Sequence, residues 1–333
     1  MRPIIPKEAP VRKSRYVAAL LVALSLTPSL TAQQAGLTVE QVDKWMSDLS
    51  NWSRWGKDDQ RGTLNLMTPA VAKAALKLVK DGVSVSLAHT IDKVPAPDSP
   101  RPIGQAMTLD AAGHAMDQYT IWYHGSVITH IDALCHYSFQ GKIYNGFDRS
   151  NIKEGVGCPQ NGIENQKSGI MTRGILVDMP LLKKVPYLDP GTAVTVADLE
   201  AWEKFAGLKI RSGDALFLRT GRWAQRAETG AWNVAANAGG FHASVLPWLK
   251  ERDVALLGND AVTDVQPSGV QGSPRPIHQV AIVAMGLPLI DVMDLEAVAK
   301  EAAARKRWEF LLTAAAVPVL GGTGFPLNPI ATF

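Results

Sequence analysis

The stretch His124-Gly-Ser-Val-Ile-Thr-His130-Ile-Asp132-Ala-Leu-Cys-His136 holds three of the chain's seven histidines and one carboxylate within thirteen residues. If it is extended, its side chains alternate between the two faces of a strand. His130 and Asp132 then point the same way, roughly 7 Å apart at Cα, and can converge on one divalent ion. His136 joins them if the chain turns after Asp132. Imidazole and carboxylate donors favour Zn²⁺, Mn²⁺ or Fe²⁺ over Mg²⁺ and Ca²⁺.

The same stretch permits a second chemistry, because Cys135 precedes His136 and a Cys–His pair can act as a nucleophile. Two observations count against it. Neighbours in a strand point to opposite faces, and a reactive thiolate suits an exported protein poorly. Cys135 and Cys158 are the only cysteines, and in an oxidising compartment they could pair with each other.

The N-terminus has the pattern of a secretory signal. A basic segment, residues 12–15, precedes an apolar run, residues 17–26, and a cleavage-like region follows at residues 27–32. The apolar run has ten residues, whereas a membrane-spanning helix needs roughly 18. We therefore predict that residues 1–32 form a cleaved signal peptide. The mature protein is expected to be secreted or periplasmic and not bound to a membrane.

The composition of the remainder excludes nucleic-acid binding. Residues 1–32 hold five Lys or Arg and one Glu, so removing them takes the formal net charge from +3 to −1. Residues 33–333 suffice for one large domain. Helical patterns (39–49, 69–81, 195–205, 295–306) alternate with strand patterns (83–87, 174–178, 215–219, 254–257, 310–320). We predict a single α/β domain with a central mixed β-sheet or barrel-like core flanked by helices.

Thr129-His130-x-Asp132-x-x-x-His136 resembles the signature of the cyclase family of metal-dependent hydrolases, which includes kynurenine formamidase and isatin hydrolase. Three further blocks are similar to the family's, at residues 55–65, 213–221 and 321–326. The resemblance spans roughly residues 50–331. It implies a cyclase-like, swivelling β/α fold and a homo-oligomer, either a dimer or a tetramer.

The resemblance also implies a ligand set. The family's typical string is His-x-Gly-Thr-His-x-Asp-x-x-x-His, so His130 and Asp132 are expected to bind metal. His136 would complete the second half of the site, together with a later histidine and an acidic residue. Those positions correspond to His278 and Asp291, although Glu is commoner at the latter.

This chain departs from the family string at its first histidine. The position four residues before His130 is Ser126, a poor ligand, which leaves two alternatives, a site for one ion or a site for two. His124 lies an even number of residues before His130, so in a strand both side chains would point to the same face and His124 could replace the missing histidine. In a straight strand, however, His124 lies roughly 20 Å from His130, so it needs a sharp bend, such as one at Gly125. Otherwise His124 is structural.

The resemblance implies a hydrolase of arylformamides, cyclic amides or lactones that uses water activated by Zn or Mn. His136 or His278, whichever is unligated, would transfer the proton to the leaving group. The aryl or cyclic substrate could lie against nearby aromatic residues, whose other interpretation is ordinary core. These residues are Trp55, Trp122, Tyr123, Tyr137 and Phe139. The alternative function is an exported, non-catalytic ligand-binding protein that lost a metal ligand at Ser126.

Overall fold

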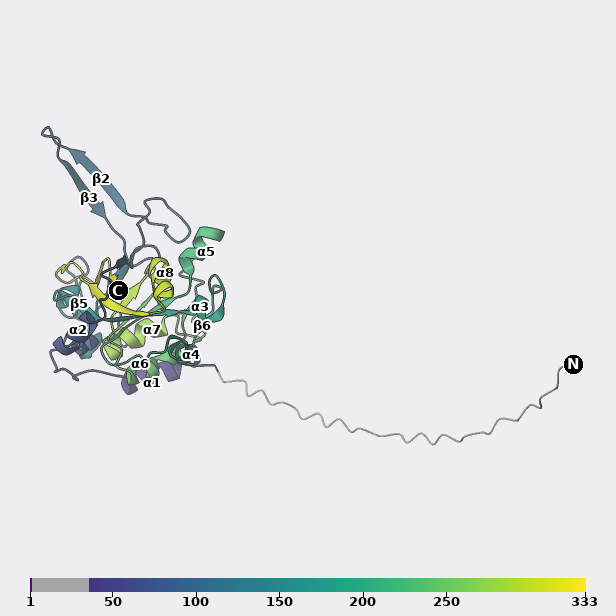
Figure 1. Cartoon of the computed structure of the whole chain (residues 1–333). Coiled ribbons are helices and arrows are strands. Elements are labelled where there is room, and N and C mark those ends of the chain that lie inside the picture. The colour runs from purple at the N-terminus through teal and green to yellow at the C-terminus, as the bar shows by residue number, and fades with distance from the viewer. Residues whose placement is uncertain (2–35) are drawn as a thin grey trace. The chain divides into compact units, whose positions relative to one another are not determined.

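A nine-stranded mixed sheet is the centre of the structure, a computed structural model that describes Met1 and residues 36–333 (Figure 1). The predicted leader, residues 1–32, lies outside the described residues apart from Met1. From edge to edge the strands are β1 (Ser84–Ser86), β13 (Ile330–Thr332), β11 (Glu309–Ala314), β5 (Ile170–Asp178), β7 (Ala215–Arg219), β9 (Leu256–Asn259), β10 (Leu289–Asp291), β4 (His130–Asp132) and β12 (Gly324–Pro326).

The middle of the sheet is parallel and its margins are antiparallel. Strands β5, β7, β9 and β10 run parallel to one another, and almost all of their residues are buried. Continuous apolar strands of this kind are stable only when both faces of the sheet are covered. The remaining strands pair antiparallel. The α/β prediction is confirmed, and the sheet is open rather than closed into a barrel.

Helices cover this sheet. Helix α2 packs on β5 and β11, and α4 also packs on β5. Two helices begin where the sequence predicts: Thr38 Oγ1 accepts a hydrogen bond from Gln41 N, and Thr195 and Asp198 form a capping box. The helices are α1 (Val39–Asp48), α2 (Pro69–Leu76), α3 (Met179–Lys183), α4 (Val196–Ala206), α5 (Arg222–Thr229), α6 (Leu246–Glu251), α7 (Pro276–His278) and α8 (Glu296–Arg305).

Two smaller sheets and several single turns complete the described chain. The small sheets pair β2 (Gly104–Leu109) with β3 (Ala115–Thr120) and β6 (Ala193–Val194) with β8 (Gly240–Phe241). The apolar stretch after α7 forms a π-helical segment, η6 (Gln279–Met285), before β10. The 3₁₀ turns are η1 (Gly62–Leu66), η2 (Tyr144–Gly146), η3 (Arg149–Asn151), η4 (Ile163–Gln166) and η5 (Ala243–Val245). Among the described residues, no helix has both the length and the apolarity that crossing a membrane requires.

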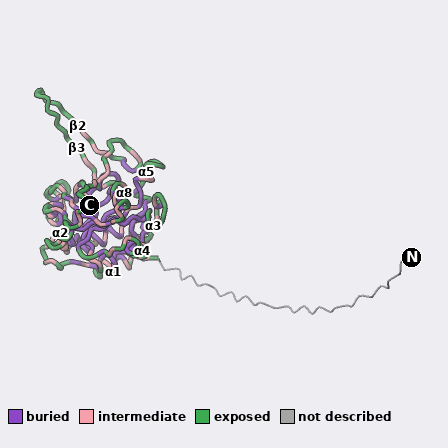
Figure 2. The backbone as a smooth tube through the Cα atoms, in the orientation of Figure 1, coloured by how far each residue is buried: buried purple, intermediate pink, exposed green. Residues whose placement is uncertain are grey.

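The segment before the motif differs from its sequence pattern. The proline-rich residues 95–103 are expected to form a surface loop, yet Asp98 and Ser99 are buried. The following residues form the β2–β3 hairpin, which extends away from the sheet and is exposed along its length (Figures 1 and 2). His114 lies in the turn between the two strands, where its Nδ1 atom is 2.8 Å from Asp110 Oδ2.

The motif itself is much less extended than the alternation of its residues suggests. Only residues 130–132 form a strand, β4, which lies between β10 and β12. His130 pairs in register with Asp291 of β10, and Asp132 pairs with Gly324 of β12. Residues 121–129 are irregular. The extended conformation considered for this stretch therefore holds for residues 130–132 alone, and the irregular residues on either side set the geometry of the site.

Candidate metal centre

Four predicted imidazole donors converge on the carboxylate of Asp132, the last residue of β4, which is 1 % exposed. Three imidazole nitrogens face Asp132 Oδ1: Nδ1 of His124 at 3.2 Å, Nε2 of His130 at 3.7 Å and Nε2 of His136 at 3.9 Å. Nε2 of His278 lies 3.7 Å from the other oxygen, Oδ2. The irregular backbone of residues 121–129 is what brings His124 to this point. Its ring centroid lies 5.1 Å from that of His130, not the roughly 20 Å of a straight strand.

Asp291, at the end of β10, closes the other side of the cluster. Its Oδ2 atom lies 3.3 Å from His278 Nε2. Its Oδ1 atom accepts hydrogen bonds from the backbone N–H and the hydroxyl of Thr263. Ser126, which occupies the family's first-histidine position, is buried nearby but is not one of these donors. His124, and not Ser126, is the residue of this segment whose ring nitrogen faces Asp132.

The chemistry of this cluster fits a divalent cation. Both carboxylate oxygens of Asp132 and Nδ1 of His124 are buried and have no hydrogen-bond partner among the described residues. A buried carboxylate without partners is costly unless it is paired or coordinates a metal. The ligand atoms of His124, His130 and Asp132 all lie within 4.8 Å of one another. These three residues can hold one ion, and His278 and Asp291 offer further donors on the Oδ2 side of Asp132.

Hydrogen bonds to the far ring nitrogens orient the histidines. Nδ1 of His130 bonds to the Ile128 carbonyl oxygen at 2.7 Å, which leaves Nε2 free to accept. Nε2 of His124 bonds to Thr323 Oγ1 at 2.9 Å, which leaves Nδ1 free. Nδ1 of His278 bonds to the carboxylate of Asp264. Partners of this kind fix the tautomer and the ring orientation of metal-binding histidines.

The protonation states of His130, His136 and Asp132 agree with this arrangement, whereas His278 must give up a proton when a cation binds. Burial lowers the pKa of His130 and lowers the pKa of His136 to about 4, so both imidazoles are neutral at pH 7. Burial also opposes a charge on His278, but the carboxylates of Asp291 and Asp264 raise its pKa well above the usual value. Although burial disfavours its charged form, the surrounding imidazoles lower the pKa of Asp132, which is ionised. Neutral imidazoles and a carboxylate are the forms that bind metal.

The C-terminal Gly-Gly-Thr-Gly turn, residues 321–324, supports the cluster from one side. Ala133 N donates to the Thr323 carbonyl oxygen at 2.9 Å, and β12 then pairs with β4. Gly324 permits this close approach, because a Cβ atom there would lie 2.3 Å from the Ile131 carbonyl oxygen. The sequence resemblance marks this turn as a family block, but it does not indicate that Thr323 contacts His124.

We expect Thr323→Val to weaken metal binding about 10- to 100-fold, the usual effect of losing a partner that orients a metal ligand. The substitution removes the acceptor for His124 Nε2 and keeps the shape of the side chain. The metal dissociation constant, measured by competition with a chelator, checks this. Thr108→Val, on the exposed β2–β3 hairpin, is the matched control. Equal affinities for the two variants would show that Thr323 does not position His124.

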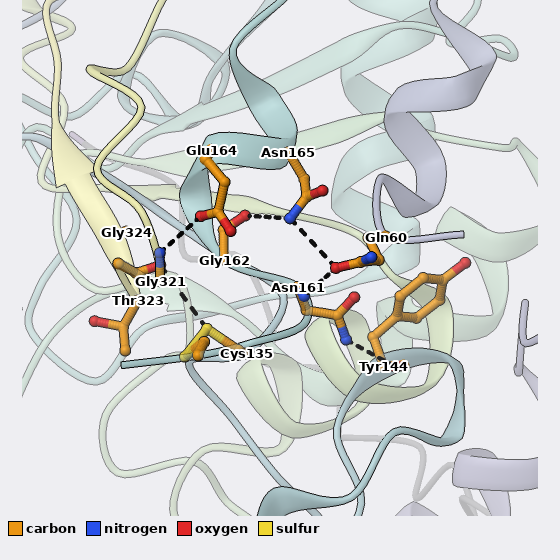
Figure 3. Close-up of a disulfide and its surroundings, with 12 residues drawn as sticks. Gln60, Cys135, Tyr144, Asn161, Gly162, Glu164, Asn165, Gly321, Thr323 and Gly324 are labelled. Carbon is orange, nitrogen blue, oxygen red and sulfur yellow. Dashed lines mark hydrogen bonds between the residues drawn. A yellow bond between two sulfur atoms is a disulfide. The ribbon is translucent and has the colours of Figure 1, made fainter. Parts of the chain in front are cut away.

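A disulfide joins Cys135, next to His136, to Cys158 (Figure 3). The same C-terminal turn adjoins it, because Cys158 N donates to the Gly321 carbonyl oxygen. Gly321 N in turn donates to Glu164 Oε2 (Figure 3). The described chain therefore has no free thiol. A Cys135–His136 nucleophile is incompatible with this structure.

Cys158→Ser is expected to lower the free energy of unfolding by about 2–4 kcal/mol, because the bridge closes a loop between residues separated by 23 positions. Urea unfolding of the oxidised wild type and of the variant measures the difference. The wild type in reducing buffer should unfold like the variant. If reduction leaves the wild-type midpoint unchanged, the disulfide contributes nothing to stability.

Two adjoining cavities provide access to these side chains. The metal cavity, of about 140 Å³, is lined by His124, His130, Asp132, His136, His278 and Asp291 with Tyr137 and Arg275. The Trp122 cavity, of about 400 Å³, is lined by Trp122, Arg101 and residues 97–100. Residues 124–126 and Ala235 line both cavities. Of the five aromatic residues expected to border the substrate, Trp122 and Tyr137 line these cavities and the other three do not.

Fold and site together define an α/β protein with a buried His–Asp centre suited to a divalent metal. Residues 84–264 match the model of the Cyclase family. A solved structure described as a novel cyclase is 31 % identical, with a TM-score of 0.75, and covers 86 % of this chain and 99 % of that one. The chain belongs to the Cyclase family.

More distant solved structures share the fold. Isatin hydrolase A from Labrenzia aggregata is 19 % identical, with a TM-score of 0.54, over 79 % of this chain and 96 % of its own. Isatin hydrolase A from Ralstonia solanacearum is 20 % identical, with the same TM-score, over 79 % of this chain and 95 % of its own. No curated protein matches the sequence.

Proposed function

We propose that this chain is a metal-dependent hydrolase that cleaves an amide or ester bond of a small aryl or cyclic substrate with metal-activated water. The observation that carries the proposal is Asp132, a buried carboxylate with no hydrogen-bond partner and with four imidazoles around it. Membership of the Cyclase family supports it. A related fold occurs in an isatin hydrolase described as bound to the product analogue thioisatinate.

Zn or Mn is the expected metal, because the donors are imidazoles and carboxylates. His124, His130 and Asp132 would hold a first ion. Asp132 Oδ2, with His278 and Asp291, would hold a second. A divalent ion would act as a Lewis acid and lower the pKa of a bound water molecule to about 7. The alternative function, a non-catalytic binding protein, rests on the loss of a ligand at Ser126, and the position of His124 beside Asp132 supports the enzyme instead.

Among the histidines, His136 is the best candidate for proton transfer. It is 24 % exposed and its ring stacks on that of His124 with 3.8 Å between centroids. None of its ring atoms takes part in a hydrogen bond that would fix its tautomer in the described structure, unlike His130 and His278. We assign His136 Nε2 to move the proton to the leaving nitrogen or oxygen, and His278 to the metal.

The cellular setting is part of the proposal. A disulfide beside the site is typical of proteins that fold in an oxidising compartment, which supports the expectation of a secreted or periplasmic protein. We also propose a homo-oligomer, a dimer or a tetramer. The β2–β3 hairpin supports it, because it exposes Met107, Leu109 and Tyr119, and an isolated two-stranded hairpin is marginally stable in water. Light scattering of the purified protein tests the oligomer.

A hydrolysis screen tests the function. N-formyl aryl amines, lactones and cyclic imides are incubated with protein prepared with Zn²⁺, with Mn²⁺ and with chelator, and bound metal is quantified in each preparation. We expect near-stoichiometric metal and turnover that chelation abolishes. Protein that binds an aryl ligand but contains no metal and hydrolyses nothing would instead support the non-catalytic function.

A further inference from the structure

Arg275, which precedes α7, is a lining residue of the metal cavity that the proposed hydrolysis does not use. Its Nη2 atom donates to the Ala235 carbonyl oxygen at 3.2 Å. Its Nη1 atom is buried and has no hydrogen-bond partner in the described chain. Nor does any carboxylate of the described residues form an ion pair with Arg275, although Asp132 and Asp291 line the same cavity. A buried N–H group of a cation is left without an acceptor.

A buried, charged N–H group without an acceptor lowers the stability of the folded protein. A guanidinium presents five N–H donors in a rigid, planar fork and cannot lose its proton in proteins. Leaving a buried charged donor unpaired costs more than leaving a neutral one unpaired. Arg173, a buried structural arginine, shows the contrast: its Nε, Nη1 and Nη2 atoms all donate to acceptors of the described chain, among them the carboxylates of Asp214 and Glu309. The missing acceptor of Arg275 would therefore be supplied by a bound ligand.

The position of Arg275 indicates where that acceptor would lie. Its backbone partner Ala235 lines both the metal cavity and the Trp122 cavity, so the guanidinium stands where the two cavities adjoin. The metal cavity is small, whereas the Trp122 cavity is in the size range of small-molecule sites. A ligand with its body against Trp122 and its reacting carbonyl at Asp132 would pass beside Arg275.

We propose that Arg275 binds a carboxylate of the substrate close to the scissile bond, so that the substrate class is an aryl or cyclic amide or ester that carries a carboxylate. This inference rests on the proposed function. Arginine suits the task because its fork matches the two oxygens of a carboxylate. Asp132 and Asp291 repel an anion, so recognition requires both the guanidinium and a bound cation. Arg275 is thus a specificity-determining residue.

Equilibrium binding of two inert probes to the zinc-loaded protein tests the inference. Benzoate has one carboxylate and phthalate has two on neighbouring ring atoms. We expect phthalate to bind roughly 10- to 100-fold more tightly than benzoate, the usual gain from a hydrogen bond to a charged group. Arg275→Gln should abolish the difference, and Arg275→Lys should retain part of it. Arg101→Gln, which removes the guanidinium 3.9 Å above the Trp122 ring, should leave the difference intact.

The outcomes separate this inference from the proposal beneath it. Equal affinities of the two probes for the wild type, or a difference that survives Arg275→Gln, would overturn the role of Arg275 and leave the hydrolase proposal standing. A difference that is lost in Arg101→Gln rather than in Arg275→Gln would assign the carboxylate to the other cation and overturn the inference equally. A protein that takes up no Zn²⁺ would overturn both.

Discussion

Asp132→Asn is expected to remove the bound metal and to lower hydrolysis at least ~1,000-fold, which corresponds to about 4 kcal/mol of transition-state stabilisation. Both carboxylate oxygens of Asp132 face imidazole nitrogens, Oδ1 that of His124 and Oδ2 that of His278. Asparagine replaces one of those oxygens by an NH₂ group, which donates hydrogen bonds and does not ligate a cation. The shape of the side chain is otherwise retained.

Metal content per chain and turnover, measured on the same preparation, check this prediction. Asp117→Asn is the matched control, because Asp117 lies on the exposed β2–β3 hairpin, where its carboxylate accepts a hydrogen bond from Gln105. It should keep full metal content and activity. If Asp132→Asn retains stoichiometric metal, the centre is not built around this carboxylate.

Asp98→Asn should lower the free energy of unfolding by about 3–5 kcal/mol, the usual result of removing one partner of a buried ion pair. The Asp98 and Arg222 side chains are 0 % and 1 % exposed and lie 2.9 Å apart. Arg226 also bonds to Asp98, at 2.7 Å. Neutralising Asp98 leaves the Arg222 guanidinium buried without this partner. The effect should extend to the Trp122 cavity, because Asp98 is part of its wall.

Denaturant unfolding of the two proteins in the same metal state measures this change. Asp92→Asn provides the comparison, because Asp92 is 52 % exposed and lies 3.5 Å from the same Arg226. Exposed pairs contribute about 0.2–1 kcal/mol, so this variant should unfold almost like the wild type. If both variants lose a similar amount of unfolding free energy, burial of the Asp98–Arg222 pair does not explain the loss.

The sequence predicts the parts of the fold that depend on local pattern. Apolar runs such as 215–219 form buried strands because both faces of the sheet are covered. Capping residues such as Thr38 and Thr195 mark the helix starts correctly. Within the site, the spacing of His130 and Asp132 suffices, because β4 does extend over these residues and places both side chains on one face.

What the sequence does not predict depends on contacts between distant segments. Alternation over residues 121–129 suggests a strand, but this segment turns back so that His124 meets His130 and Asp132. The proline-rich residues around Asp98 look like a surface loop, and only the packing of α5 against them explains their burial. Thr323 carries no local signal, because the histidine that it contacts, His124, is 199 positions away, and Asp264 is 14 positions from His278 with no motif that links them.

The donors of the centre come from two regions far apart in the chain, residues 124–136 and residues 278–291. An ion held by both Asp132 and His278 would join positions about 150 residues apart. It would stabilise the folded chain, because the unfolded chain rarely brings such distant ligands together. The lifetime of the protein would then follow the supply of metal where it resides. Protein made without metal would unfold more often and be degraded by proteases, although all of its catalytic side chains are present.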